Sequence, residues 1–102
     1  MAMLHIVNKS PFERNTLSSC LRLAKKGSSV LLIEDGIYGA VKNTAQSDMV
    51  SGAMGDIKFH VLGEDLKARG ISEDKLIEGI KVVDYAGFVS LVSEHDNNQS
   101  WL

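Results

Sequence analysis

The chain has 102 residues, enough for one hydrophobic core but not for two, so we expect a single domain over residues 1–102. Hydrophobic residues make up 44% of the chain and charged residues 24%, which is typical of a folded globular protein rather than a disordered or fibrous one. The formal net charge is −2 and the longest basic run is Lys25-Lys26, so direct binding of nucleic acid is not expected.

The N-terminal segment MAMLHIVNKS has neither the charged start nor the long apolar region of a signal peptide, which predicts a cytoplasmic protein. The longest apolar run, residues 30–33, is far shorter than the roughly 20 residues that cross a bilayer, so no membrane association is expected. A single cysteine cannot form an internal disulfide. His5, His60 and His95 lie far apart in the sequence and predict no metal site.

The first half of the chain alternates strand and helix signals. Residues 4–7 (LHIV) predict a strand, closed by the turn residues of NKSP. Asn15 stands as a helix N-cap, and Lys25-Lys26 in the last turn with Gly27 just beyond predict the end of that helix. Its apolar stripe at i, i+3, i+4 and i+7 consists of Leu17, Cys20, Leu21 and Ala24. Residues 29–34 (SVLLIE) are apolar on both faces, which predicts a strand covered by helices on each side.

The second half continues the alternation after a turn at Asp35-Gly36. Residues 38–44 and 49–54 are less periodic and are interrupted by glycines, which predicts a helix broken or followed by a mobile loop. The remaining predicted elements are a strand (57–62), a short helix (64–69) ended by Gly70, a turn (72–76) capped by Ser72, a fourth strand (81–84) and a final helix (85–94). This order predicts a small three-layer α/β/α sandwich with an open, mostly parallel sheet, because parallel neighbours need crossover connections.

Cys20 is the candidate reactive residue. A lone thiol in a cytoplasmic protein can act as a nucleophile or a sulfur carrier, provided that its pKa is lowered and that it can be reached. Its place on the apolar stripe with Leu17 and Leu21 equally predicts a core residue, since free cysteine is often buried. The same stripe could also face a partner subunit, which would put Cys20 at an interface.

Three other features of the sequence allow a site but favour a structural interpretation. Glu34-Asp35 follows a predicted strand, where open sheets place ligands, yet Asp35-Gly36 is first of all a turn. His5 is either a core histidine with its hydrogen bonds satisfied or a proton donor near the cleft. No Gly-x-Gly-x-x-Gly follows a strand and no Gly-Lys-Ser/Thr occurs, so the glycines predict turns and no nucleotide or other cofactor is expected.

Two aromatic residues are candidates for protein contacts. The loop after the first predicted strand carries Phe12 beside Arg14, and this pair of residue types is common in the energetically dominant part of interfaces. Trp101 is too large and apolar to be a free surface residue, so we expect it to dock on the chain itself or on a partner.

Taken together, these residues carry a resemblance. The segment LHIVNKSPFERNTLSSCLRLAKKGSSVLLIEDGIYGAV resembles the DsrH/TusB family of sulfur relay proteins, and the likeness continues through FHVLGEDLKARGI, VVDYAGFVSLV and the final SWL. Its most specific parts are the initial LH, the KSPF loop, the LLIEDG strand and turn, the DLKARG segment and the VDYAGFV segment. Cys20 matches a cysteine in the first helix of the DsrH branch, which TusB-type members generally lack, so the likeness is closest to DsrH.

The resemblance implies a fold, an assembly and a chemistry. The fold would be a small α/β sandwich, and the chain would be one of three related subunits of a hetero-hexamer with DsrE-like and DsrF-like subunits. Sulfur would travel as a cysteine persulfide and pass to a DsrC-like or TusE-like acceptor. The DsrH branch belongs to dissimilatory sulfur oxidation in the cytoplasm, whereas the Tus branch supplies sulfur for 2-thiouridine at the wobble position of transfer RNA. The presence of Cys20 favours the first of these.

Three hypotheses follow for the function. The leading one is a sulfurtransferase component in which Cys20 is the catalytic residue and holds persulfide sulfur. The competing one is a non-catalytic structural subunit of the same kind of complex, including one that serves transfer RNA thiolation, with Cys20 as core packing. The third is a stand-alone small-molecule binder of flavodoxin type, which has only fold analogy behind it. Self-association of the isolated chain stays open.

Overall fold

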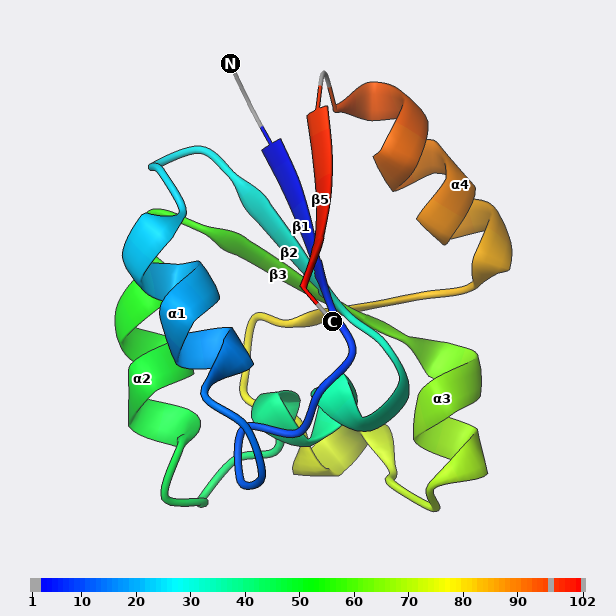
Figure 1. The fold of residues 1–102 in the computed structure, drawn as a ribbon. Helices are drawn as coiled ribbons and strands as arrows, with labels where there is room; N and C mark the ends of the chain where they lie inside the picture. The colour runs from blue at the N-terminus through cyan, green and yellow to red at the C-terminus, as the bar shows by residue number, and fades with distance from the viewer. Residues whose placement is uncertain (1–2, 96, 102) are drawn as a thin grey trace.

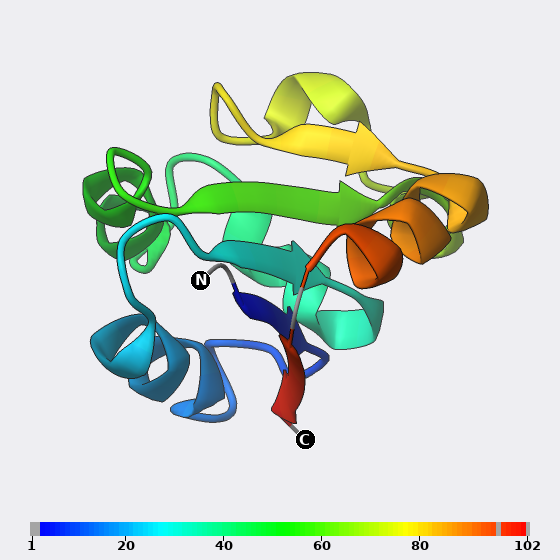
Figure 2. The same cartoon turned by 90° about the horizontal axis from the view of Figure 1, so that it is seen from above.

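Five parallel strands form the centre of the molecule. The computed structural model describes residues 3–95 and 97–101. The strands are β1 (Met3–Val7), β2 (Ser29–Leu32), β3 (Lys58–Leu62), β4 (Lys81–Val83) and β5 (Asn97–Trp101). They lie side by side in the order β4-β3-β2-β1-β5, and every pairing between them is parallel (Figure 2).

Helical segments make up the connections between these strands. They are α1 (Thr16–Leu23), the 3-10 helix η1 (Glu34–Ala40), α2 (Ser47–Ala53), α3 (Gly63–Ala68), the 3-10 helix η2 (Glu73–Lys75) and α4 (Tyr85–Glu94). The helices α1 and α2 lie on one side of the sheet and α4 on the other (Figure 1). The predicted α/β class, with an open parallel sheet between helix layers, is therefore confirmed.

Side-chain alternation along the strands divides the core between the two faces of the sheet. On one face Val30 and Phe59 pack in the same buried cluster as Leu17 of α1. On the other face Leu31 packs with Leu91 of α4. All of β2 is buried, as its apolar sequence predicts for a strand covered on both sides. Each fully buried side chain of this size contributes about 1.5–3 kcal/mol to stability, so the central strand anchors both layers.

The helix α1 differs from its prediction at both ends. Asn15 occupies the N-cap position, but its side chain makes no capping hydrogen bond. The helix ends at Leu23, so Lys25-Lys26 lie in the loop rather than in the last turn. Gly27 is left-handed with φ +90°, and its N–H donates to the carbonyl of Asp56 at 2.8 Å. The glycine thus serves a loop contact with a distant segment, which sequence spacing does not reveal.

The segment after β2 also differs from its prediction. The strand ends at Leu32, and the expected turn at Asp35-Gly36 is the first part of η1. The broken helix expected over residues 38–44 and 49–54 consists of two separate helices, η1, which ends at Ala40, and α2. Between them Val41 forms an isolated antiparallel bridge. A periodic apolar pattern is not what holds η1 in place. Its close approach to the end of β1, described below, fixes its position.

The strand β5 was not predicted. Its sequence NNQSW carries no hydrophobic strand pattern, yet each of its five residues pairs with one residue of β1. The pairing uses backbone groups, so a polar sequence can fill an edge position that no hydrophobic pattern announces. Within the described residues, no helix is long and apolar enough to cross a lipid bilayer.

Candidate functional site

Cys20, the predicted reactive residue, lies in the interior of this chain. The apolar stripe of α1 faces the sheet, and the side chains of Leu17 and Cys20 are both 0% exposed. Leu21 and Ala24 are partly buried and pack against the same cluster. The stripe therefore packs against the chain's own sheet, and Cys20 lines none of the hollows described below.

The surroundings of Cys20 disfavour its ionised form. Burial raises the pKa of the Cys20 thiol to about 12, because a thiolate loses its hydration in an apolar core. At pH 7 the thiol is then almost entirely protonated. The thiolate is the nucleophile in sulfur transfer, so this conformation of the chain holds Cys20 in its inert form.

The two other sequence candidates near the N-terminal strand are paired with each other. The indole N–H of Trp101 donates to Nδ1 of His5 at 3.0 Å, and the two ring centroids are 6.1 Å apart. His5 is 3% exposed, and burial lowers its pKa. Trp101 therefore docks on its own chain, which is one of the two alternatives expected for it. His5 is a core histidine whose Nδ1 accepts a hydrogen bond.

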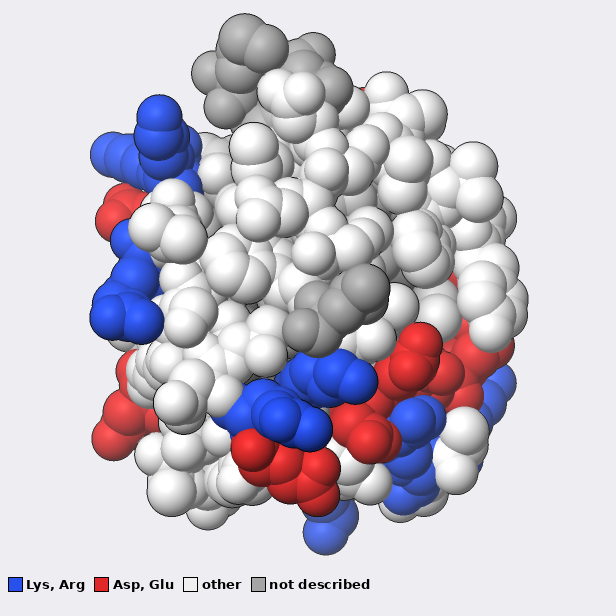
Figure 3. All heavy atoms as spheres, in the orientation of Figure 1, with Lys and Arg blue, Asp and Glu red and all other residues white. Residues whose placement is uncertain are grey.

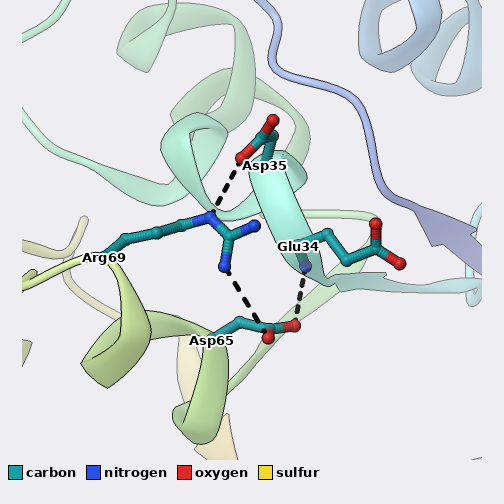
Figure 4. Close-up of polar contacts among 4 residues, drawn as sticks. All are labelled: Glu34, Asp35, Asp65 and Arg69. Atoms are coloured by element: carbon teal, nitrogen blue, oxygen red, sulfur yellow. Dashed lines mark hydrogen bonds and ion pairs between the residues drawn. The ribbon is translucent and has the colours of Figure 1, made fainter.

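A polar network joins the ends of two neighbouring strands, where open sheets place ligands. The N–H of Glu34 donates to Oδ2 of Asp65 at 2.7 Å, and Nε of Arg69 donates to Oδ1 of Asp35 at 3.0 Å (Figure 4). Nη1 of Arg69 lies 3.8 Å from Oδ1 of Asp65. The network links the segments LLIEDG and DLKARG, and it uses the carboxylates of Asp35 and Asp65 to hold η1 against α3. Sequence reasoning did not find the contributions of Asp65 and Arg69. Their partners Glu34 and Asp35 lie 31 and 34 residues away in the chain.

The backbone of the same segment is constrained. Glu34 adopts φ +49°, the left-handed region that costs a non-glycine residue about 1–2 kcal/mol. A Cβ atom added to Gly36 would lie 2.2 Å from the carbonyl oxygen of Val7, so only glycine fits where η1 crosses the end of β1. The N–H of Ile33 donates to that same oxygen at 3.0 Å. The interpretation of Asp35-Gly36 as structural rather than ligand-binding agrees with these contacts.

The loop after β1 is folded back on itself and leaves its aromatic residue outside. Oγ of Ser10 accepts the N–H of Phe12 at 3.2 Å, and Ser10 also accepts at its carbonyl from Arg14 at 3.0 Å. Phe12 is 52% exposed. A hollow of about 540 Å³ is lined by Lys9, Arg14 and Trp101, together with residues at the start of α1. The predicted role of Phe12 in protein contacts stays a prediction.

A second hollow, of about 650 Å³, lies beyond the ends of β3 and β4. Gly63, Val83 and Asp84 are among its lining residues. Asp84 caps α4, because its Oδ1 accepts the N–H of Gly87 at 2.8 Å. The sequence placed candidate ligands after the second strand only. This hollow, at the ends of the next two strands, was missed because its walls come from distant segments.

The histidines predicted not to form a metal site have separate environments. His60 is 7% exposed, burial lowers its pKa, and neither ring nitrogen has a hydrogen-bond partner among the described residues. His95 Nδ1 lies 2.7 Å from the carbonyl oxygen of Leu91, and its Nε2 lies 3.0 Å from Oγ of Ser29. In residues 3–95 and 97–101, no three side chains of metal-binding type gather into a ligand set.

The overall fold is shared by solved proteins. The MTH1491 protein of Methanobacterium thermoautotrophicum has a TM-score of 0.76 and 22% identity, covering 97% of this chain and 96% of that one. The ychN protein of Escherichia coli also has a TM-score of 0.76, at 15% identity, covering 98% of this chain and 99% of that one. At these identities the likeness shows the fold alone, and it places the chain in one class of small α/β proteins.

The sequence comparisons identify the family within that class. The TusB proteins of Shigella flexneri and of Escherichia coli K12 are each 33% identical over 99 residues, which is 97% of this chain and 100% of theirs. The family described as "DsrH like protein" matches residues 9–98. The chain therefore belongs to the DsrH/TusB family of sulfur-relay complex subunits, as the resemblance indicated.

Proposed function

We propose that this chain is a cytoplasmic subunit of a DsrEFH-type or TusBCD-type sulfur-relay complex, and that it contributes by assembly rather than by its own thiol. Family membership supports the first part of the proposal. The observation that carries the second part is the burial of Cys20, which is 0% exposed and has its pKa raised to about 12. In this proposal Cys20 fills the core beneath α1.

The partners follow from the family. A DsrE-like and a DsrF-like subunit, or their TusD and TusC counterparts, would complete a hetero-hexamer, and a DsrC-like or TusE-like protein would accept the sulfur. Similarity to TusB proteins over the whole of their length supports the branch that makes 2-thiouridine in transfer RNA. Dissimilatory sulfur oxidation was favoured by the presence of Cys20 alone, and a buried thiol weakens that argument.

The carrier hypothesis for Cys20 requires a different conformation. The thiol would have to leave the core, which means that α1 lifts from the sheet and exposes Leu17 with it. Re-exposing two buried side chains of this kind costs several kcal/mol, at about 1.5–3 kcal/mol for a large one. A partner subunit that captures the opened helix would have to supply this free energy.

The deciding experiment uses the chain assembled with its two partner subunits. After incubation with a persulfide donor, mass spectrometry of each intact subunit should show added sulfur on a partner cysteine and none on Cys20. Cys20→Ala and Cys20→Ser should both assemble and transfer sulfur at the wild-type rate, with thermal unfolding as the check on folding. Added sulfur on Cys20, lost together with transfer in both variants, would establish the carrier role instead.

A second experiment assigns the branch. The chain, produced with its partners in cells that lack TusB, should restore 2-thiouridine at the wobble position of transfer RNA. Failure to restore it, with sulfur still delivered to a DsrC-like acceptor in vitro, would assign the complex to sulfur oxidation.

A further inference from the structure

The hollow of about 540 Å³ lies at the point where the order of the strands reverses. β2 follows β1 on one side of the sheet, whereas β5 lies on the other side of β1. In open parallel sheets, ligands bind beyond the carboxyl ends of the strands at such a switch point. Val7 and Trp101 are paired in register at the carboxyl ends of β1 and β5, and Trp101 lines the hollow. The fold therefore places this hollow where a ligand is expected.

The lining of the hollow is basic. It consists of side chains from the loop after β1, the start of α1 and the end of β5: Lys9, Arg14, Asn15, Thr16, Ser19 and Trp101. Two of these residues are positively charged and none is negatively charged, although the whole chain has a formal charge of −2. The hollow beyond β3 and β4 has the opposite character, since it is lined by Glu64, Glu73 and Asp84 with a single lysine.

The two cations of this hollow have no carboxylate partner in the described part of the chain. In residues 3–95 and 97–101, the ion pairs are those of Arg69, so they involve neither Lys9 nor Arg14. Figure 3 shows Lys and Arg side chains gathered in the lower centre of the face, over the loop after β1, and the carboxylates drawn next to them do not line the hollow. Two positive charges at one hollow repel each other, and an anion bound between them would remove this repulsion.

The neutral residues of the lining add further hydrogen-bond donors. Thr16 and Ser19 each carry a hydroxyl, and Asn15 carries an amide that makes no capping hydrogen bond. The indole N–H of Trp101 is bonded to Nδ1 of His5, so the rest of that side chain is an apolar wall. Two cations with several neutral donors match a ligand that presents several charged oxygens.

We propose that this hollow binds a small tetrahedral oxyanion, phosphate or sulfate, either free or as the end group of an ester. Lys9 and Arg14 would supply charge-assisted hydrogen bonds, and Thr16 and Ser19 the neutral ones. The site is more than the start of α1, because Lys9 and Trp101 come from other segments. Anion binding here does not depend on the sulfur chemistry of the family.

Trp101 provides the readout, because it is the only tryptophan of the chain. The full chain is titrated with phosphate or sulfate in place of chloride at constant ionic strength, and its tryptophan fluorescence should change along a saturable curve. Phenyl phosphate distinguishes the two sources of the oxyanion. Tighter binding than that of inorganic phosphate would indicate an ester held against Trp101, and equal binding would indicate the free ion.

Lys9→Gln and Arg14→Gln should each weaken binding about 10-fold, since each removes a charge-assisted hydrogen bond. Lys26→Gln is the matched control, because it removes the same charge from an exposed loop position outside the hollow and should bind as wild type does. Unchanged affinity in both site variants, or equal weakening in Lys26→Gln, would refute the site.

A measurement on the unaltered protein covers the case in which a site variant does not fold. The amide chemical shifts of Thr16 and Ser19 should move along a saturable curve as phosphate or sulfate is added. The amide of Ser72, at the hollow beyond β3 and β4, should not move. The absence of a saturable shift at both Thr16 and Ser19 with either anion would overturn the proposal.

Discussion

Gly36 offers the sharpest test of the geometry at the end of the sheet. An alanine Cβ at this position would lie 2.2 Å from the carbonyl oxygen of Val7, whereas Cβ atoms in proteins essentially never approach a heavy atom within 3.0 Å. The obstacle is backbone, so β1 and η1 must separate by at least the difference of 0.8 Å. That movement also lengthens the 3.0 Å hydrogen bond from Ile33 to Val7.

The cost of Gly36→Ala follows from these two effects. Overpacking in a close-packed region costs about 1–3 kcal/mol, and a weakened hydrogen bond adds about 1 kcal/mol. We expect a loss of about 2–4 kcal/mol in the free energy of unfolding, a large part of the roughly 5–15 kcal/mol typical of a domain. Urea unfolding followed by circular dichroism measures it.

The matched control is Gly52→Ala. Gly52 lies within α2, and a Cβ atom there would meet nothing within 4 Å, so the same chemical change should stabilise the helix by about 0.5–1 kcal/mol. If Gly36→Ala is no more destabilising than about 0.5 kcal/mol, the close approach of η1 to β1 is refuted.

Three further predictions concern other buried or bridging groups. Burial lowers the pKa of His60, so the unfolded chain binds its proton more readily and the free energy of unfolding should fall as pH drops below about 6.5. His60→Leu should show a smaller fall than wild type between pH 7 and 5 in urea titrations; equal falls would contradict this. Asp65→Ala removes the acceptor of the Glu34 N–H and should lower the free energy of unfolding by about 1–2 kcal/mol in the same assay. The control Glu64→Ala, at an exposed position, should change it very little, and similar values for the two variants would argue against the hydrogen bond from Glu34 to Asp65. The thiol of Cys20 should react with a thiol reagent at pH 8 more than about 100-fold slower in the folded chain than in urea, and comparable rates would show that it is accessible.

The alternation of strand and helix signals was sufficient to predict the class of fold. β2 is apolar on both faces and is buried along its length, and the short strands on either side of it occupy neighbouring positions. Such a signal is local and strong, because a strand between two helix layers must be apolar throughout. The final strand β5 was not predicted, because an edge strand needs only backbone pairing with β1 and polar side chains are compatible with that pairing.

The site was less predictable for a different reason. The stripe that contains Cys20 was correctly located on α1, but the same periodicity arises whether the stripe meets its own sheet or a partner. Only the packed structure distinguishes these two cases. The bridge from Arg69 to Asp35 and the fit of Gly36 against Val7 likewise join segments that are far apart in the chain, so no spacing rule could have found them.

Two of the segments that carry the family resemblance shape the end of the sheet. LLIEDG contains Glu34, which has a left-handed φ, and Gly36, which fits closely against Val7. DLKARG contains Asp65, which accepts the N–H of Glu34, and Arg69, which donates to Asp35. None of these groups is a nucleophile, and the one thiol of the chain lies in the core. A cysteine that carries sulfur must be accessible and partly ionised, whereas Cys20 is 0% exposed and burial raises its pKa to about 12. The burial of this thiol therefore supports our proposal that the chain contributes by assembly rather than by handling the sulfur itself.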